Sequence, residues 1–308
     1  MNPTKLEGTE KFTPRLGQMI EGWRKSNPGV KKKLPVEVDV PEQMARMGRV
    51  ACALDMVKAV GDLALIAFYF LLRVGEYTVR GCAGRRSAVV DYSKQTEQFR
   101  VRDARFFARS VEGTQRQISP HAPDEAIMSA ASATMRLGNQ KNGWKNVCIH
   151  QEANGCDYFC PVRALGRRVC YIRRHTSDRD TLLSAHWHEG ARCDVTDGDI
   201  RESIKAAAAT LRCPETRGIE IDDVDTHSLR GGGANALHMA GYTDHQIIKM
   251  GRWKTKTFLE YIREELGCFS SGMSRAMKRV FKYVNVSGDR WNNVTSAAVV
   301  SNYKSEAE

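Results

Sequence analysis

The sequence lacks a hydrophobic run long enough to cross a membrane. Its most apolar stretch, LALIAFYFLL from Leu63 to Leu72, is about half of the ~20 residues that a spanning helix needs. The first residues, MNPTKLEGTEKF, have no apolar core of the kind that a secretory signal peptide carries. We therefore predict a chain that is not secreted and has no membrane partner, with Leu63–Leu72 forming a buried helix.

The chain lacks the cysteine pattern of a small disulfide-bonded framework, and it is poor in acidic charge relative to basic charge. Nine cysteines in 308 residues fit thiols of a reducing compartment, the nucleus if the organism is eukaryotic and otherwise the cytoplasm. There are 47 Lys and Arg residues against 36 Asp and Glu residues, a net charge of +11. This excess favours a polyanionic partner, first of all nucleic acid.

Hydrophobic periodicity predicts a mainly helical α+β protein with a small antiparallel sheet, and no internal repeat is visible. Helices are predicted over residues 15–26, 44–57, 63–77, 161–174, 196–211, 227–241 and 243–251, followed by one that contains Tyr261 and one over 271–284. Strands are predicted over 97–107 and 124–150, with a tight turn at Asn142-Gly143. Thr196 and Thr243 are predicted N-caps of their helices.

Composition divides the chain into three parts. Residues 1–40 are predicted to be an N-terminal extension or linker with a basic triplet, and a possible remnant of a further domain. Residues 41–284 form the predicted folded domain. Residues 285–308, rich in Asn, Ser and Ala, are predicted to be a tail that is mobile or docks on a partner.

Two polar fragments lie in the first half of the predicted domain. In LLRVGEYT, Arg73 ends an apolar helix and Glu76 follows one turn later, which on its own indicates a local ion pair. In QKNG, Lys141 stands beside the Asn-Gly turn and on its own indicates a solvated hairpin charge.

Two more fragments lie in the second half. THSLRGGG places His227 and Arg230 on one face of a helix start. Three glycines follow, where each costs a helix about 1 kcal/mol, so we expect something to approach that backbone closely. GRWKTKTFLEYIRE places Tyr261 at the edge of an apolar stripe, and taken alone it indicates a core tyrosine.

Together the four fragments resemble the tyrosine recombinase (phage-integrase) family in order and spacing. The matched residues are Arg73 with Glu76, Lys141 on a β-hairpin, His227 with Arg230, and Tyr261. Four sequence fragments are most similar to recombinases of eukaryotic mobile elements of the Crypton and DIRS type: LLRVGEYT, QKNG, CPVRAL and GRWKTKTFLEYIR. The resemblance covers about residues 41 to 284 and implies the catalytic-domain fold of that family.

The resemblance implies a role for each matched residue in cutting and rejoining double-stranded DNA. Tyr261 is the nucleophile that holds the cut end as a 3′-phosphotyrosine. Arg73 and Arg230 direct their guanidinium donors at the phosphate oxygens. Lys141 protonates the departing 5′ oxygen, and His227 assists proton transfer or hydrogen-bonds the phosphate. The positive charges come from protein, so no metal or cofactor is required, and two to four protomers are expected to assemble on the DNA.

Several alternatives stay open. The family usually has His or Trp nine residues before its tyrosine, but that position is Arg252 here, and Trp253 follows it; we favour Trp253 as the phosphate ligand. Lys145 competes with Lys141 as general acid. The family usually has a helical core-binding domain before the match, where only about 40 residues stand here. A catalytically silent DNA-binding protein and a type IB topoisomerase-like enzyme are the alternative functions.

Two further sets of residues were weighed. His and Cys residues suggest zinc, but the C-x₃-C spacing is loose and no second pair repeats it, so we do not expect a structural zinc site. Those residues are His150, Cys156, Cys160 and Cys170, and His186, His188 and Cys193. Arginines on the helix from Pro161 indicate a solvated face or contacts to DNA phosphates. They are Arg163, Arg167, Arg168, Arg173 and Arg174.

Overall fold

A computed structural model of the chain describes residues 14–26, 33–80, 96–110, 113–139, 145–256 and 259. Its helices are α1 (Pro14–Ser26), α2 (Asp39–Met47), α3 (Asp55–Tyr69), α4 (Val74–Tyr77), α5 (Asp124–Met128), α6 (Pro161–His175), α7 (Asp197–Thr210), α8 (Cys213–Arg217), α9 (Thr226–Met239) and α10 (Asp244–Gly251). Its strands are β1 (Ala104–Arg109), β2 (Gln115–Gln117), β3 (Ser132–Asn139), β4 (Lys145–Glu152), β5 (Ala185–His188) and β6 (Ala191–Asp194). The predicted class, mainly helical α+β with a small antiparallel sheet, is confirmed.

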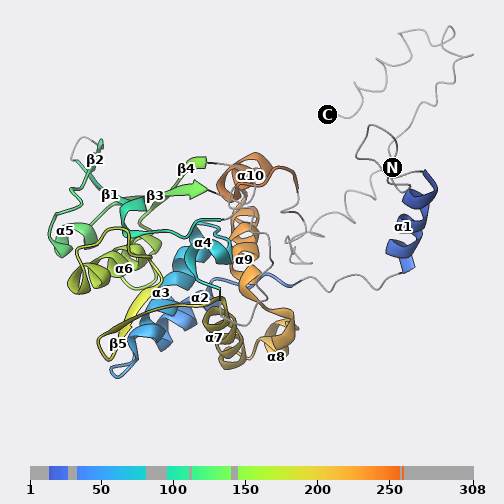
Figure 1. Cartoon of the computed structure of the whole chain (residues 1–308), viewed down its shortest axis with the longest axis horizontal. Helices are drawn as coiled ribbons and strands as arrows, with labels where there is room; N and C mark the ends of the chain where they lie inside the picture. Colours follow the sequence, from blue (N-terminus) through green and yellow to red (C-terminus); the bar gives the residue numbers. More distant parts are fainter. Residues whose placement is uncertain are drawn as a thin grey trace, which may run out of the picture. The chain divides into compact units, whose positions relative to one another are not determined.

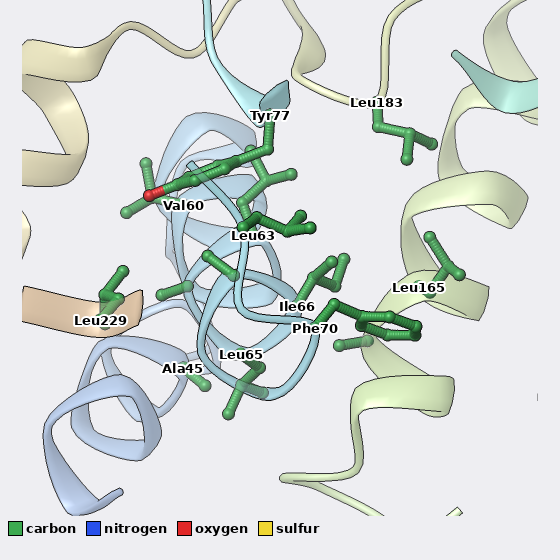
Figure 2. Close-up of a cluster of buried hydrophobic side chains, with 14 of the residues drawn as sticks. Ala45, Val60, Leu63, Leu65, Ile66, Phe70, Tyr77, Leu165, Leu183 and Leu229 are labelled. Carbon is green, nitrogen blue, oxygen red and sulfur yellow. The ribbon is translucent and has the colours of Figure 1, made fainter. Parts of the chain in front are cut away.

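Helix α3 is the centre of the core. Its residues from Ala59 to Phe68 are buried on every side, and it packs against α2, α6 and α9. Figure 2 shows Leu63 and Ile66 of α3 between Leu165 of α6 and Leu229 of α9. The prediction of a buried apolar helix is therefore confirmed. Across the described residues, no helix has the combination of length and apolarity that crossing a membrane requires.

The helices predicted over 44–57 and 63–77 have wrong boundaries, because α2 ends at Met47 and α3 already begins at Asp55. The second prediction also misses a break between α3 and α4. Leu71 takes a left-handed backbone conformation (φ 51°), which an α-helix cannot contain. A new helix, α4, begins at Val74. The Glu76 side chain accepts a hydrogen bond from the backbone N–H of Arg73, the residue before that helix, at 2.8 Å. A long apolar run hides this break, because periodicity alone does not report the conformation of one residue.

The main sheet has four antiparallel strands in the order β2-β1-β3-β4. Strands β3 and β4 pair from Ser132 opposite Glu152 to Asn139 opposite Lys145 and form a hairpin. The predicted Asn142-Gly143 turn lies outside the described residues.

The predicted strand boundaries need two corrections. Residues 101–103 form a 3₁₀ turn before β1, and the region predicted as strand from residue 124 begins with helix α5. Pro123 precedes α5, and two acidic residues in its first turn favour a helix start.

The predicted N-caps are confirmed. Thr196 accepts a hydrogen bond from the backbone N–H of Asp199 at 3.2 Å and caps α7. Thr243 does the same for Gln246 at 3.4 Å and caps α10. The side chains of Asp199 and Gln246 in turn accept a hydrogen bond from the backbone N–H of Thr196 and Thr243. Both helices therefore begin with a full capping box. The cysteines among the described residues carry free thiols.

The glycines after Arg230 permit the close approach predicted for them. A side chain at Gly232 would overlap the carbonyl of Val36, and one at Gly233 would overlap the carbonyl of Phe68 in α3. The segment before α2 is held at the same place, since the Val36 N–H donates to the Ser228 carbonyl at 3.2 Å. The groups that approach α9 are thus the chain's own backbone, and they fix α9 against α3.

Candidate active site

The candidate site begins at the start of α4. Glu76 is fully buried and accepts two hydrogen bonds from Arg73, one from its backbone N–H at 2.8 Å and one from its guanidinium Nη1 at 3.2 Å. The Arg73 side chain stays 20% exposed, against 0% for Glu76. The local ion pair is therefore present, and it leaves part of a cationic side chain open to solvent.

Arg252 reaches the same carboxylate from the other end of the sequence. It ends α10 in a left-handed conformation (φ 58°), and its Nη2 donates to Glu76 at 2.8 Å and to the carbonyl of Leu71 at 3.1 Å. Its side chain is 1% exposed. Burial lowers the pKa of Arg252, while the charge of Glu76 acts against that change. The left-handed residue that closes α10 is thus Arg252, one residue beyond the end predicted for this helix.

Arg230 lies beside these groups and is also buried. Its Nη1 donates to the Leu71 carbonyl at 3.0 Å, and its Nη2 donates to the carbonyl of Gly251. Its guanidinium carbon lies 4.4 Å from the centre of the Trp253 ring, a cation–π contact. The Leu71 carbonyl therefore accepts from both Arg230 and Arg252 and links α9, α10 and the break between α3 and α4, which lie next to one another in Figure 1.

Gly251 explains how Trp253 reaches Arg230. A side chain at Gly251 would overlap the six-membered ring of Trp253, so only glycine lets the indole fold back against the end of α10. Trp253 is 9% exposed. The sequence Gly-Arg-Trp thus places an arginine inside the core and a tryptophan over a second arginine.

Three guanidinium groups, from Arg73, Arg230 and Arg252, lie around α4 and the chain before it. Two of them, those of Arg73 and Arg252, contact the Glu76 carboxylate, and the third donates to the carbonyls of Leu71 and Gly251.

His227 lies on the first turn of α9, one turn before Arg230, and its side chain is exposed. The residue that positions this turn is Asp225, which the sequence prediction missed. Its carboxylate accepts from the Thr226 N–H at 2.6 Å and from Arg201 Nε at 3.1 Å. Burial alone would raise the pKa of Asp225, but these bonds and the Arg201 charge bring it below its ordinary value. An Asp three residues before Ser228 is an N-cap signal that could have been found.

Two of the predicted catalytic residues, Lys141 and Tyr261, lie outside the described residues. Lys145 is exposed at the first position of β4, opposite Asn139. The described residues thus bring together Arg73, Arg230 and Trp253, with His227 one turn away, and leave the general acid and the nucleophile unplaced.

The arginines of α6 do not form the solvated face that was one of their two predictions. Arg168 is fully buried and donates to the carbonyls of Leu183 and Ala185, and Arg167 binds Asp62 at 2.6 Å. Arg174, 69% exposed, still pairs with Asp124. Most of these arginines therefore tie α6 to its neighbours.

The residues weighed as zinc ligands do not meet. Within the described ranges, no three His, Cys, Asp or Glu side chains come close enough together to hold a metal ion. Cys170 is buried in α6, and burial, with Asp124 beside it, raises the pKa of its thiol to about 12.

The chain is similar in structure to several recombinases and integrases. The Tn1549 transposon integrase in complex with transposon right end DNA has 10% identity and a TM-score of 0.38, over 82% of this chain and 68% of that chain. XerA recombinase has 13% identity and a TM-score of 0.45, over 82% and 67%. The same integrase with circular intermediate DNA has 10% identity and a TM-score of 0.40, over 84% and 76%. No protein-family profile and no curated protein matches the sequence. Likeness at this level does not establish a family.

Proposed function

We propose that the chain is a DNA strand transferase of the tyrosine-recombinase kind. It would cut one strand of double-stranded DNA, hold the cut end as a 3′-phosphotyrosine on Tyr261, and reseal it with a 5′-hydroxyl from a partner strand. One contact carries the proposal: Arg230 donates to the carbonyl of Leu71, 159 residues away in the sequence. Leu71 is two residues before Arg73, so both arginines of the sequence pattern stand at one place.

The chemistry assigns each group a task. The phosphodiester gains negative charge on its non-bridging oxygens as Tyr261 attacks, and the guanidinium of Arg73, whose side chain is 20% exposed, would donate to those oxygens. Arg230 has five N–H donors, and its two described bonds to carbonyls fix its orientation. The bond from Tyr261 to phosphorus forms as the bond from phosphorus to the 5′ oxygen breaks. His227, exposed on the first turn of α9, would accept the tyrosine proton, and the departing 5′ oxygen would take a proton from Lys141.

We assign different roles to Arg252 and Trp253. Arg252 is enclosed and bound to Glu76, so we assign it to positioning α4 and Arg73. Trp253 lies against Arg230, so we assign it the direct contact with the phosphate through its indole N–H. Trp253→Phe keeps a ring but removes that donor. It should slow cleavage about tenfold or more in protein that is still folded at the assay temperature, since one charge-assisted hydrogen bond is worth about 1.5–3 kcal/mol. An unchanged cleavage rate would contradict this role for Trp253.

The proposal extends to the assembly and its setting. Two to four protomers would act on paired sites of double-stranded DNA, with residues 285–308 as the segment that docks on a neighbour. The division of the chain into an N-terminal extension (1–40) and a catalytic domain (41–284) remains a prediction. A mobile-element origin, and a nuclear location if the organism is eukaryotic, also remain predictions.

One observation favours a second candidate, a DNA-binding protein without cleavage. Arg230 is 4% exposed and donates from both terminal nitrogens to backbone carbonyls, as a purely structural arginine would. Such a protein would bind DNA through its net charge of +11 and form no covalent product.

A nicked suicide DNA substrate separates the two functions. The strand transferase forms a covalent adduct that survives denaturation and is lost in Tyr261→Phe, whereas the silent binder forms none. An adduct that persists in Tyr261→Phe would show that another residue is the nucleophile. Relaxation of a supercoiled plasmid without paired sites would favour the topoisomerase-like alternative.

The general acid has its own test. A DNA whose bridging 5′ oxygen is replaced by sulfur needs no proton to leave. It should therefore restore cleavage by Lys141→Ala, and Lys145→Ala is the matched control, expected to cleave the normal substrate. If only Lys145→Ala is restored by sulfur, Lys145 is the general acid.

A further inference from the structure

A cavity lies apart from the candidate active site. It has a volume of about 520 Å³ and is lined by β1, the segment after β2, the end of α5 and the C-terminal half of α6 with the residues that follow it. In Figure 1 these elements lie at the left of the described chain, well away from α9 and α10. The volume falls in the range of small-molecule sites in proteins, ~300–1,000 Å³.

The floor of the cavity is apolar. Phe106 from β1, Ile127 from α5 and Val169 from α6 line it, and each side chain keeps only 2–5% of its surface accessible. A ligand that fills this floor therefore needs an apolar body, because a polar one would give up its water without a partner.

The rim of the cavity is cationic. Among the described lining residues are four arginines, Arg102, Arg105, Arg173 and Arg179, and no carboxylate. Arg102 is paired with Asp180. The exposed side chains of Arg105 and Arg179 have no hydrogen bond or ion pair with any residue that the structure describes. Within the described ranges, Arg105 and Arg179 thus give the cavity mouth positive charge that no ion pair neutralises.

Arg173 adds a buried donor. Its Nη2 donates to the carbonyl of Ala122 at 2.9 Å, but its Nη1 is buried without a hydrogen-bond partner and lies 3.8 Å from Asp124 Oδ1. Buried polar atoms in native proteins are almost always paired. Because Arg173 lines the cavity, an anionic group bound beside it would offer this nitrogen an acceptor in addition to the Asp124 charge.

We propose that this cavity binds a small amphipathic anion, a carboxylate, sulfonate or phosphate monoester with a flat or branched apolar body. The apolar floor takes the body, and Arg173 with the rim arginines takes the anionic group. The site is independent of strand transfer, since it shares no residue with the Arg73–Arg230 cluster.

Two fluorescent probes with the same aromatic body test the proposal on the full chain. Anilinonaphthalene sulfonate carries an anionic group, and phenylnaphthylamine is the same molecule without it. We expect the sulfonate to bind at one site per chain, with a Kd on the order of 10–100 μM, and to bind at least ~10-fold more tightly than the neutral probe. Equal affinity of the two probes, or binding of the sulfonate at many equivalent sites, would overturn the proposal.

Arg179→Glu and Arg116→Glu form a matched pair of variants. Both replace an exposed arginine and lower the net charge by two, but Arg116 lies on β2 and does not line the cavity. Arg179→Glu should weaken the sulfonate about tenfold and leave the neutral probe within about twofold, because a nearby charge acts only on the anion. Arg116→Glu should change neither beyond about twofold. Equal weakening by both variants would mean that overall charge holds the probe.

Nucleic acid is the competing occupant of the cationic rim. A short DNA duplex should leave the bound sulfonate in place at low salt if the cavity holds a small ligand. Displacement by DNA that is lost in Arg179→Glu would assign the rim to a nucleic-acid surface and overturn the small-ligand site.

Discussion

Replacing Glu76 by Gln should destabilise the chain far more than replacing any exposed glutamate. The carboxylate of Glu76 is 0% exposed and lies 2.8 Å from Arg252 Nη2, whose side chain is 1% exposed. At that distance and an effective dielectric constant of about 20, the charges attract by ~6 kcal/mol before desolvation is subtracted. Removing one partner of such a buried pair typically costs about 3–5 kcal/mol, because the other charge stays buried and uncompensated. We expect a loss in that range.

The assay is urea unfolding at pH 7 followed by circular dichroism, with Glu42→Gln as the matched control. Glu42 pairs with Arg46 at 3.3 Å, but their side chains are 23% and 49% exposed, so its loss should cost at most about 1 kcal/mol. Adding Arg252→Met to Glu76→Gln removes the stranded charge. The double variant should therefore lose less stability than the sum of the two single variants. The reasoning would be refuted if Glu76→Gln cost less than about 1 kcal/mol. It would also be refuted if the losses of the two single variants added up to the loss of the double variant, because the buried Glu76–Arg252 pair would then contribute nothing.

Two smaller predictions concern α9. Gly232→Ala should cost about 1–3 kcal/mol in urea unfolding, because the added carbon meets the backbone carbonyl of Val36 and overpacking is costly; Gly75→Ala, with nothing within 4 Å, should be neutral or slightly stabilising. The lowered pKa of Asp225 means that its carboxylate stabilises the fold above its unfolded pKa of about 3.8 and stops doing so as pH falls through the lower, folded value. Asp225→Asn should therefore lose about 1 kcal/mol at pH 7 through the Arg201 pair, a difference that shrinks below about pH 4; a loss unchanged at pH 2.5 would contradict this.

Helices with explicit end signals could be predicted from the sequence. α6 begins at Pro161 with the proline at its first position, and α7 and α10 begin after threonine capping boxes. Each signal is local, because the residues that satisfy the first N–H groups lie within four positions of one another. Local chemistry fixed these boundaries to within one residue of their predicted starts.

The β5–β6 hairpin shows what local signals miss. Its turn is Glu189-Gly190, and both residues have positive φ, 48° and 77°, as a two-residue hairpin turn requires. Asn or Asp at the first position would have predicted the turn from the sequence. Glutamate rarely takes a conformation with positive φ, so it gave no such signal. The strand pairing, from Ala185 opposite Asp194, holds Glu189 where its own preference would not.

The sequence indicated Arg73, Arg230 and Trp253 as site residues, but it did not indicate the contacts that hold them in place. Arg73 with Glu76 could be read as a local pair, since they are three residues apart. The second partner of Glu76 is 176 residues away, and no spacing rule connects α4 with the end of α10. That contact depends on α9 packing against α3 through Gly232 and Gly233, which is a property of the whole fold.

The same reasoning explains why counting residues back from Tyr261 could not decide between Arg252 and Trp253. Counting gives a position along the chain, but the direction of a side chain depends on the backbone conformation there. Arg252 is left-handed (φ 58°), so the chain reverses at the end of α10 and sends two consecutive side chains to different partners. Arg252 turns inward to Glu76, and Trp253 folds over Arg230. The arginine at the usual ligand position is therefore enclosed with Glu76, and Trp253 beside it contacts Arg230.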